Sequence, residues 1–201
     1  MERSLVVIKP DGAIRRTVGA LVLKDLMGRG YHVKAFKEMK VSESLAKLHY
    51  DIHKEKPFFP WLVQFITSAR VLAMILEADD VIQGGKYGIW AGVNIAHASD
   101  APETATTETV LWTKEGGLEE SDDAENTAKD YVERYAPRNL DFTKEIRALV
   151  ESSIDVNDTS SAVLESLEDL FGRDSEGVDE SEIKALSLAV FDFIKEEIEK
   201  K

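Results

Sequence analysis

The 201-residue sequence predicts an α+β fold, in which an antiparallel sheet is covered by helices and is followed by a C-terminal helical extension. Three observations lead to this prediction. Apolar runs typical of buried strands alternate with segments of helical periodicity in the first half of the chain. Acidic residues are concentrated in the second half, where apolar residues recur at helical spacing. A chain of this length can hold one full domain and a smaller appendage.

The elements of the first half follow one another in a defined order. The run SLVVIK at residues 4–9 is a buried strand, because the turn sequence PDG closes it. The remaining segments are a helix at 13–28, a strand at 31–41, a helix at 42–53 with Ser42 as its cap, a short helix at 57–68, a buried strand at 70–78, a strand at 87–97 and a helix from 102 to about 112. Asp100 and Glu103 have capping-box spacing, and Pro102 lies in the first turn of that last helix. This order is close to that of a ferredoxin-like sheet covered by helices.

The charge distribution predicts a domain boundary near residue 113. Residues 1–112 carry 14 Lys and Arg against 13 Asp and Glu, whereas residues 113–201 carry 11 against 25. We therefore predict a first domain at 1–113, an acidic linker at 114–126 and an acidic helical extension at 127–201. Helical stretches are expected at about 141–153, 158–171 and 179–199. Their apolar stripes are typical of packing between helices, and binding of a partner protein is the alternative.

Composition excludes several classes of function. The chain has no cysteine, which excludes disulfides, thiolate metal sites and a cysteine nucleophile. The N-terminus has no signal-peptide pattern, and no apolar run is long enough to cross a membrane. The acidity of the second half argues against nucleic-acid binding through that part. We expect a soluble, cytoplasmic protein without membrane or nucleic-acid partners.

Three stretches resemble the signature sequences of nucleoside diphosphate kinases. They are IKPDG at residues 8–12, HYDIHKEKPFFPWLVQFITS at 49–68 and NIAHASD at 94–100, and they occur in the order of that family. The resemblance covers roughly residues 2–112. It implies a phosphotransferase that moves the γ-phosphate of a nucleoside triphosphate to His97 and then to a nucleoside diphosphate. It also implies Mg²⁺ that is bound by the nucleotide.

The resemblance assigns catalytic roles to side chains around His97. A neutral imidazole is a good nucleophile near neutral pH. By resemblance, Glu108 accepts a hydrogen bond from the ring nitrogen that does not attack, and Ser99 supports this pair. Lys9 reaches the transferring phosphoryl group, and Tyr50 lies near Lys9 and His97. Considered alone, His97 has the alternative of a structural loop histidine, and the shared context of these residues favours catalysis.

Nucleotide-binding roles follow from the same resemblance. Phe58 stacks on the base, although packing in the core is the alternative for Phe58. Asn94 hydrogen-bonds the ribose or the phosphates, and Lys86 substitutes for an arginine of the family. His49 and His53 have the spacing of a metal-binding pair, but no third ligand follows them. We therefore expect them to be surface or packing residues and expect no metal site made by the protein.

The sequence also departs from the family pattern. The connection between Asp79 and Asn94 is shorter than in the family, so a threonine and an arginine that contact the phosphates have no counterpart. Arg70 stands where the family usually has proline, and it is a candidate to compensate for the missing cation. The shortened connection predicts weaker substrate binding and a homo-oligomer smaller than a hexamer. The alternative function is a catalytically impaired nucleotide-binding or interaction module on the same fold.

Overall fold

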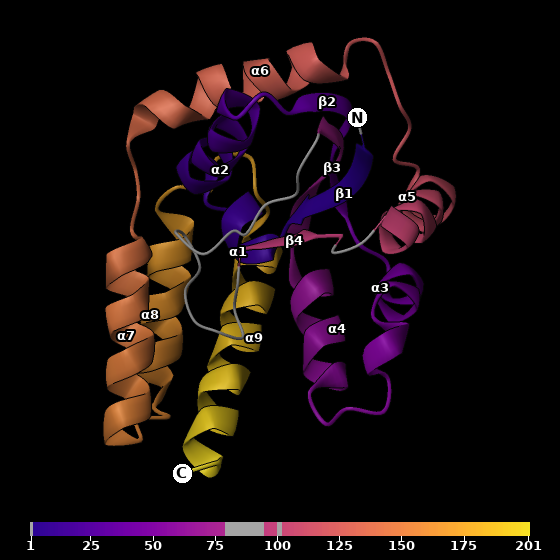
Figure 1. The fold of residues 1–201 in the computed structure, drawn as a ribbon. Coiled ribbons are helices and arrows are strands. Elements are labelled where there is room, and N and C mark those ends of the chain that lie inside the picture. The colour runs from indigo at the N-terminus through magenta and orange to yellow at the C-terminus, as the bar shows by residue number, and fades with distance from the viewer. Residues whose placement is uncertain (1, 79–94, 100–101) are drawn as a thin grey trace.

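The computed structural model describes residues 2–78, 95–99 and 102–201. The described strands are β1 (Glu2–Ile8), β2 (His32–Lys40), β3 (Arg70–Ala78) and β4 (Ala96–Ala98). They form an antiparallel sheet with the order β2-β3-β1-β4 (Figure 1). This order is that of a ferredoxin-like sheet, so the predicted fold class is confirmed. The strand predicted at residues 87–97 lies mostly outside the described residues.

Helices of the first half connect these strands. They are α1 (Pro10–Ala13), α2 (Arg16–Gly28), α3 (Glu43–His49), the 3-10 turn η1 (Asp51–His53), α4 (Phe59–Ser68) and α5 (Pro102–Gly116). Ser42 caps α3, because its hydroxyl accepts a hydrogen bond from the backbone N–H of Leu45 at 3.2 Å. Helix α5 continues four residues beyond its predicted end and stops before Gly117, whose positive φ of 61° suits glycine. Asp100, the expected capping residue of α5, lies outside the described residues.

The second half contains one helix more than the sequence predicts. Its elements are α6 (Ala124–Tyr135), the 3-10 turn η2 (Ala136–Arg138), α7 (Thr143–Val156), α8 (Ser161–Gly172) and α9 (Glu180–Glu199). Helix α6 lies where an acidic linker and the start of the extension were expected. Its buried residues are Ala124, Ala128, Tyr131 and Tyr135, and their spacing of three to four residues places them on one face. Figure 1 shows α6 lying across β2 and α2, while α7, α8 and α9 stand together beside α4.

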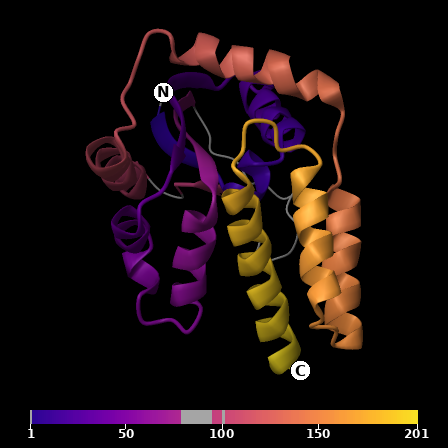
Figure 2. The same ribbon diagram turned by 180° about the vertical axis from the view of Figure 1, so that it is seen from behind.

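Each face of the sheet has its own core, because side chains alternate between faces along a strand. Val6 and Ile8 of β1 belong to the core shared with α2 and α6, whereas Leu5 and Val7 face the core shared with α3 and α4. A third core joins α7, α8 and α9 to Ile14, Trp61 and Phe65 of the first half. Figure 2 shows α9 beside α4 from behind. The described part of the chain contains no helix that is both long and apolar enough to cross a membrane.

Candidate active site

The short strand β4 presents His97 at the edge of the sheet. His97 pairs with Val7 of β1, and α5 then turns back so that Glu108 reaches the imidazole. The Nε2 atom of His97 lies 3.0 Å from both carboxylate oxygens of Glu108. The hydroxyl of Ser99 donates to Oε2 of the same carboxylate at 2.6 Å. Because the carboxylate accepts the Nε2 proton, the lone pair of the imidazole is on Nδ1.

Opposing effects act on the Glu108 carboxylate. Burial by itself would raise its pKa, but the hydrogen bonds from His97 and Ser99 outweigh burial, and the pKa lies below its ordinary value. Glu108 is therefore ionised at neutral pH. An ionised carboxylate at Nε2 stabilises positive charge that develops on the imidazole ring.

A second histidine, His49, packs in the site, although the sequence analysis did not assign it there. The rings of His49 and His97 lie 4.5 Å apart, nearly perpendicular to each other, and the ring of Tyr50 lies 4.6 Å from that of His49. Trp112 donates its indole N–H to Nδ1 of His49 at 3.3 Å. Burial lowers the pKa of His49 to about 3, so this ring is neutral at physiological pH. The signal in the sequence was the helical spacing of Glu108 and Trp112, which places both on one face of α5.

His49 and His53, which were both expected to be surface or packing residues, lie in different surroundings in the structure. His49 packs at the centre of the candidate site, whereas His53 lies in η1, 5.6 Å from the ring of Phe58. Phe58 precedes α4 and is 44% exposed, so it does not pack fully in the core. Tyr50 is buried, and burial raises the pKa of its phenol, so the phenol stays protonated.

Lys9 occupies the turn between β1 and α1. Its backbone N–H donates to the carbonyl of Ile95 at 2.8 Å, and its carbonyl accepts from Gly12 and Ala13 at 2.9 Å. Burial lowers the pKa of Lys9 to about 8, and the nearby Asp11 opposes this shift. Asp11 is completely buried, and burial raises its pKa to about 7. Sequence reasoning had noted Asp11 only as part of a turn.

The remaining predicted site residues, Lys86 and Asn94, lie outside the described residues. Among the residues that are described, His49, His97 and Glu108 place one potential metal ligand each within 4.8 Å of one another. Two nitrogen ligands and one carboxylate do not suit Mg²⁺, which prefers an octahedron of oxygen ligands. This cluster of side chains is therefore not suited to hold Mg²⁺ by itself.

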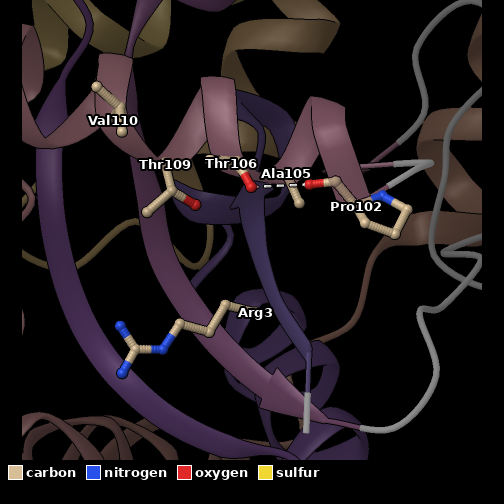
Figure 3. Close-up of a pocket in the computed structure, with 6 residues that line it drawn as sticks. All are labelled: Arg3, Pro102, Ala105, Thr106, Thr109 and Val110. Carbon is tan, nitrogen blue, oxygen red and sulfur yellow. Dashed lines mark hydrogen bonds between the residues drawn. The ribbon is translucent and has the colours of Figure 1, made fainter.

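A hollow of about 400 Å³ lies on a different face of α5 (Figure 3). It is lined by Arg3, Pro102, Ala105, Thr106, Thr109 and Val110. The hydroxyl of Thr106 donates to the carbonyl of Pro102 at 2.9 Å, and Arg3 forms ion pairs with Glu77 and Glu120. The hollow contains no residue of the His97 cluster and is therefore separate from the candidate site.

Comparisons with known proteins agree with this geometry. The family model described as nucleoside diphosphate kinase matches residues 2–86. A nucleoside diphosphate kinase from a Synechococcus strain is 41% identical over 137 residues, which cover 59% of this chain and 91% of the relative. A nucleoside diphosphate kinase from Macrococcus caseolyticus is 42% identical over 134 residues, which cover 57% of this chain and 90% of the relative.

The chain belongs to the nucleoside diphosphate kinase family. A solved structure of a nucleoside diphosphate kinase from Halobacterium salinarum in complex with CDP is similar to it, with a TM-score of 0.52 and 32% identity. The similarity covers 63% of this chain and 97% of that structure. The Aquifex aeolicus nucleoside diphosphate kinase is similar with a TM-score of 0.51 and 30% identity, covering 55% of this chain and 93% of that structure. Each similarity leaves at least a third of this family member uncovered.

The contacts of Arg70 bear on whether it replaces the phosphate-binding arginine that this nucleoside diphosphate kinase homologue lacks. Two nitrogens of its guanidinium, Nε and Nη2, donate to the carboxylate of Glu182 at 3.1 and 2.8 Å. The third nitrogen, Nη1, donates to Glu38 at 2.6 Å. Arg70 thus joins the start of β3 to α9. This arrangement argues against the idea that Arg70 compensates for the missing phosphate-binding cation.

Proposed function

We propose that His97 is the phosphate carrier of this nucleoside diphosphate kinase. The hydrogen bond between Nε2 and Glu108 carries the proposal, because it leaves the lone pair of Nδ1 available as the nucleophile. Nδ1 attacks the γ-phosphorus of a nucleoside triphosphate, and the bond to the bridging oxygen of the β-phosphate breaks. The diphosphate leaves, and a β-phosphate oxygen of a second nucleoside diphosphate then takes the phosphoryl group from Nδ1. Membership of the family supports this reaction, since relatives at about 40% identity carry that name.

The neighbours of His97 support both half-reactions. The carboxylate of Glu108 stabilises the imidazole ring as it becomes positively charged, and Ser99 holds that carboxylate in place. Lys9 stabilises the negative charge of the transferring phosphoryl group, and its pKa of about 8 keeps it mainly protonated at neutral pH. Tyr50 stays a neutral hydrogen-bond donor in a buried position. Mg²⁺ enters on the phosphates of the substrate, as is general for this family.

Recognition of the nucleotide is proposed to rest on Phe58, Asn94 and Lys86. The exposed ring of Phe58 offers a stacking surface, and stacking tolerates every base because each base has a π-face. The roles of Asn94 and Lys86 rest on the resemblance of their sequence context to the family. The cytoplasmic location also stays a prediction.

We propose a homo-oligomer smaller than a hexamer. One support is the outer edge of β2, which the chain covers with its own residues. The backbone N–H of Ser121 donates to the carbonyl of Lys34 at 3.0 Å, and the ammonium of Lys37 donates to the carbonyls of Gly116 and Gly117 at 3.0 Å. An edge that is partly paired offers fewer backbone groups to a second subunit.

The experiment that tests the carrier is phosphorylation by labelled ATP with Mg²⁺. We expect acid-labile label on His97, complete discharge of the label by GDP, and no label on the His97→Ala variant. His32→Ala is the matched control, because His32 is an exposed histidine of β2 whose ring faces the carboxylate of Glu125 and not the His97 cluster. Label on another histidine, or label that persists in His97→Ala, would overturn the proposal, and absence of any label from the wild-type protein would favour the impaired binding module.

A further inference from the structure

A buried arginine, Arg15, forms hydrogen bonds both to the turn after Lys9 and to the second half of the chain. Arg15 lies at the start of α2 and is 1% exposed. Its Nε donates to the backbone carbonyl of Asp11 at 2.6 Å, and its Nη2 lies 3.5 Å from the Asp11 carboxylate. Its Nη1 donates to the hydroxyl of Thr143 at 2.8 Å. Thr143 is the first residue of α7 and lies 128 positions after Arg15 in the sequence. The guanidinium of Arg15 therefore binds both Asp11 in the turn and Thr143 in the second half of the chain.

The hydroxyl of Thr143 is arranged as an acceptor for this guanidinium. It donates its one proton to the carboxylate of Asp141 at 2.5 Å, and the backbone N–H of Thr143 donates to the same oxygen at 2.9 Å. A hydroxyl that has donated its proton retains lone pairs for a donor such as Arg15. The negative charge of Asp141 polarises the hydroxyl and strengthens the hydrogen bond from the cation.

The turn that Arg15 holds is short and depends on contacts outside itself. Helix α1 has four residues, and an isolated turn of this length is not stable in water. Its hydrogen bonds run from Gly12 and Ala13 to the carbonyl of Lys9, the residue whose ammonium serves the phosphoryl group in the proposed function. The Asp11 carboxylate lies 3.5 Å from Nη2 of Arg15, at the limit of a hydrogen bond, and burial raises the pKa of that carboxyl. A second anchor for the guanidinium therefore matters to the geometry of this turn.

We propose that Thr143, supported by Asp141, is a positioning residue of the phosphotransfer site. Thr143 holds Arg15, Arg15 holds Asp11 and the α1 turn, and the turn places Lys9 against the transferring phosphoryl group. The C-terminal extension thereby becomes part of the catalytic apparatus. The effect on catalysis rests on the proposed function of His97 and Lys9, whereas the effect on the turn does not.

The test compares Thr143→Val with Thr143→Ser in the full-length chain. Valine keeps the shape of threonine and removes the hydroxyl, whereas serine keeps the hydroxyl. We expect Thr143→Val to slow phosphorylation of His97 by about tenfold to a hundredfold, because small displacements of a catalytic group have effects of this size. The dissociation constant for a nucleoside diphosphate should change by less than about threefold, and Thr143→Ser should restore the rate. The control is Glu182→Gln, which loosens α9 from Arg70 without touching Arg15.

A second measurement reads the turn directly and does not depend on activity. Amide hydrogen exchange of Gly12 and Ala13 should accelerate in Thr143→Val and stay at the wild-type rate in Thr143→Ser and Glu182→Gln. An unchanged exchange rate in Thr143→Val would overturn the positioning role. The role would also be overturned if the loss of phosphorylation rate were simply proportional to the decrease in melting temperature across all the variants. If wild-type protein formed no phosphohistidine, the proposed function would fall, while the exchange rates would still decide whether Thr143 holds the turn.

Discussion

Replacing Arg70 by alanine separates a structural role from a phosphate-binding role. In the structure the guanidinium bridges Glu182 of α9 and Glu38 of β2, and the side chain of Glu182 is only 2% exposed. Hydrogen bonds from Arg70 outweigh the effect of burial and lower the pKa of Glu182 to about 2. Glu182 therefore stays ionised at neutral pH, and the variant leaves a buried carboxylate without its main partner.

The size of the expected loss follows from the contacts that remain. Removing one partner of a buried ion pair costs about 3–5 kcal/mol. Glu182 keeps the ammonium of Lys40 at 3.2 Å and the backbone N–H of residue 70 at 2.8 Å. We therefore expect the lower end, about 3 kcal/mol, which corresponds to a decrease in Tm of about 6–12 °C for a chain of this length.

Urea denaturation and thermal melting of the single and double variants test this expectation. Arg70→Ala and Glu182→Ala should couple by about 2 kcal/mol in a double-mutant cycle. Arg29→Ala is the matched control, because Arg29 pairs with Asp25 on the surface and should change stability by less than about 0.5 kcal/mol. Steady-state kcat/KM per folded molecule should stay within about threefold of wild type in Arg70→Ala. The reasoning is refuted if Arg70→Ala leaves Tm unchanged and raises KM for the nucleotide, since Arg70 would then serve the phosphates.

Three further predictions concern the site and the assembly. The kcat/KM for phosphotransfer should fall as the pH rises through about 8, because Lys9 acts in its protonated form and its pKa lies below the ordinary value of 10.5. The pH–rate profile of Lys9→Arg should lack this decrease, because arginine keeps its charge. Competition among ATP, GTP and CTP should give affinities within about tenfold, roughly 1.4 kcal/mol. Phe58→Ala should weaken the binding of all three by a similar factor of about 5 to 100. A strong preference for one base would instead reveal a contact specific to that base. Light scattering should report fewer than six subunits, and a stable hexamer would contradict the proposed effect of the shortened connection and the covered edge of β2.

Local signals were sufficient for the elements that carry the chemistry. The run before Lys9 is a buried strand closed by Pro10, and these features depend only on residues that are adjacent in the sequence. The resemblance to the family paired Glu108 with His97, and the structure brings these two residues, eleven positions apart, into contact. The sheet order followed from the alternation of strand and helix signals, since few topologies are compatible with that alternation.

Other roles depended on contacts between distant parts of the chain. His49 was expected to be a surface or packing residue, because helical spacing alone does not show that Trp112 and His97 enclose it. Helix α6 was not predicted, because its sequence is acidic and its apolar face is narrow. Its formation depends on burial of Tyr131 and Tyr135 against β2 and α2, and tertiary packing can supply helix stability that local propensity does not.

The sequence by itself determined the fold of the first half, the family and the candidate nucleophile with its partner Glu108. The tertiary structure decided how the second half is used: Glu182 neutralises Arg70, and Thr143 holds Arg15 beside the Lys9 turn. The physical reason is that an apolar stripe predicts only that a helix buries one face, and a charged residue that becomes buried requires a partner of opposite charge. Which surface gives the cover, and which side chain is that partner, depends on residues more than a hundred positions apart that meet only when the chain is folded.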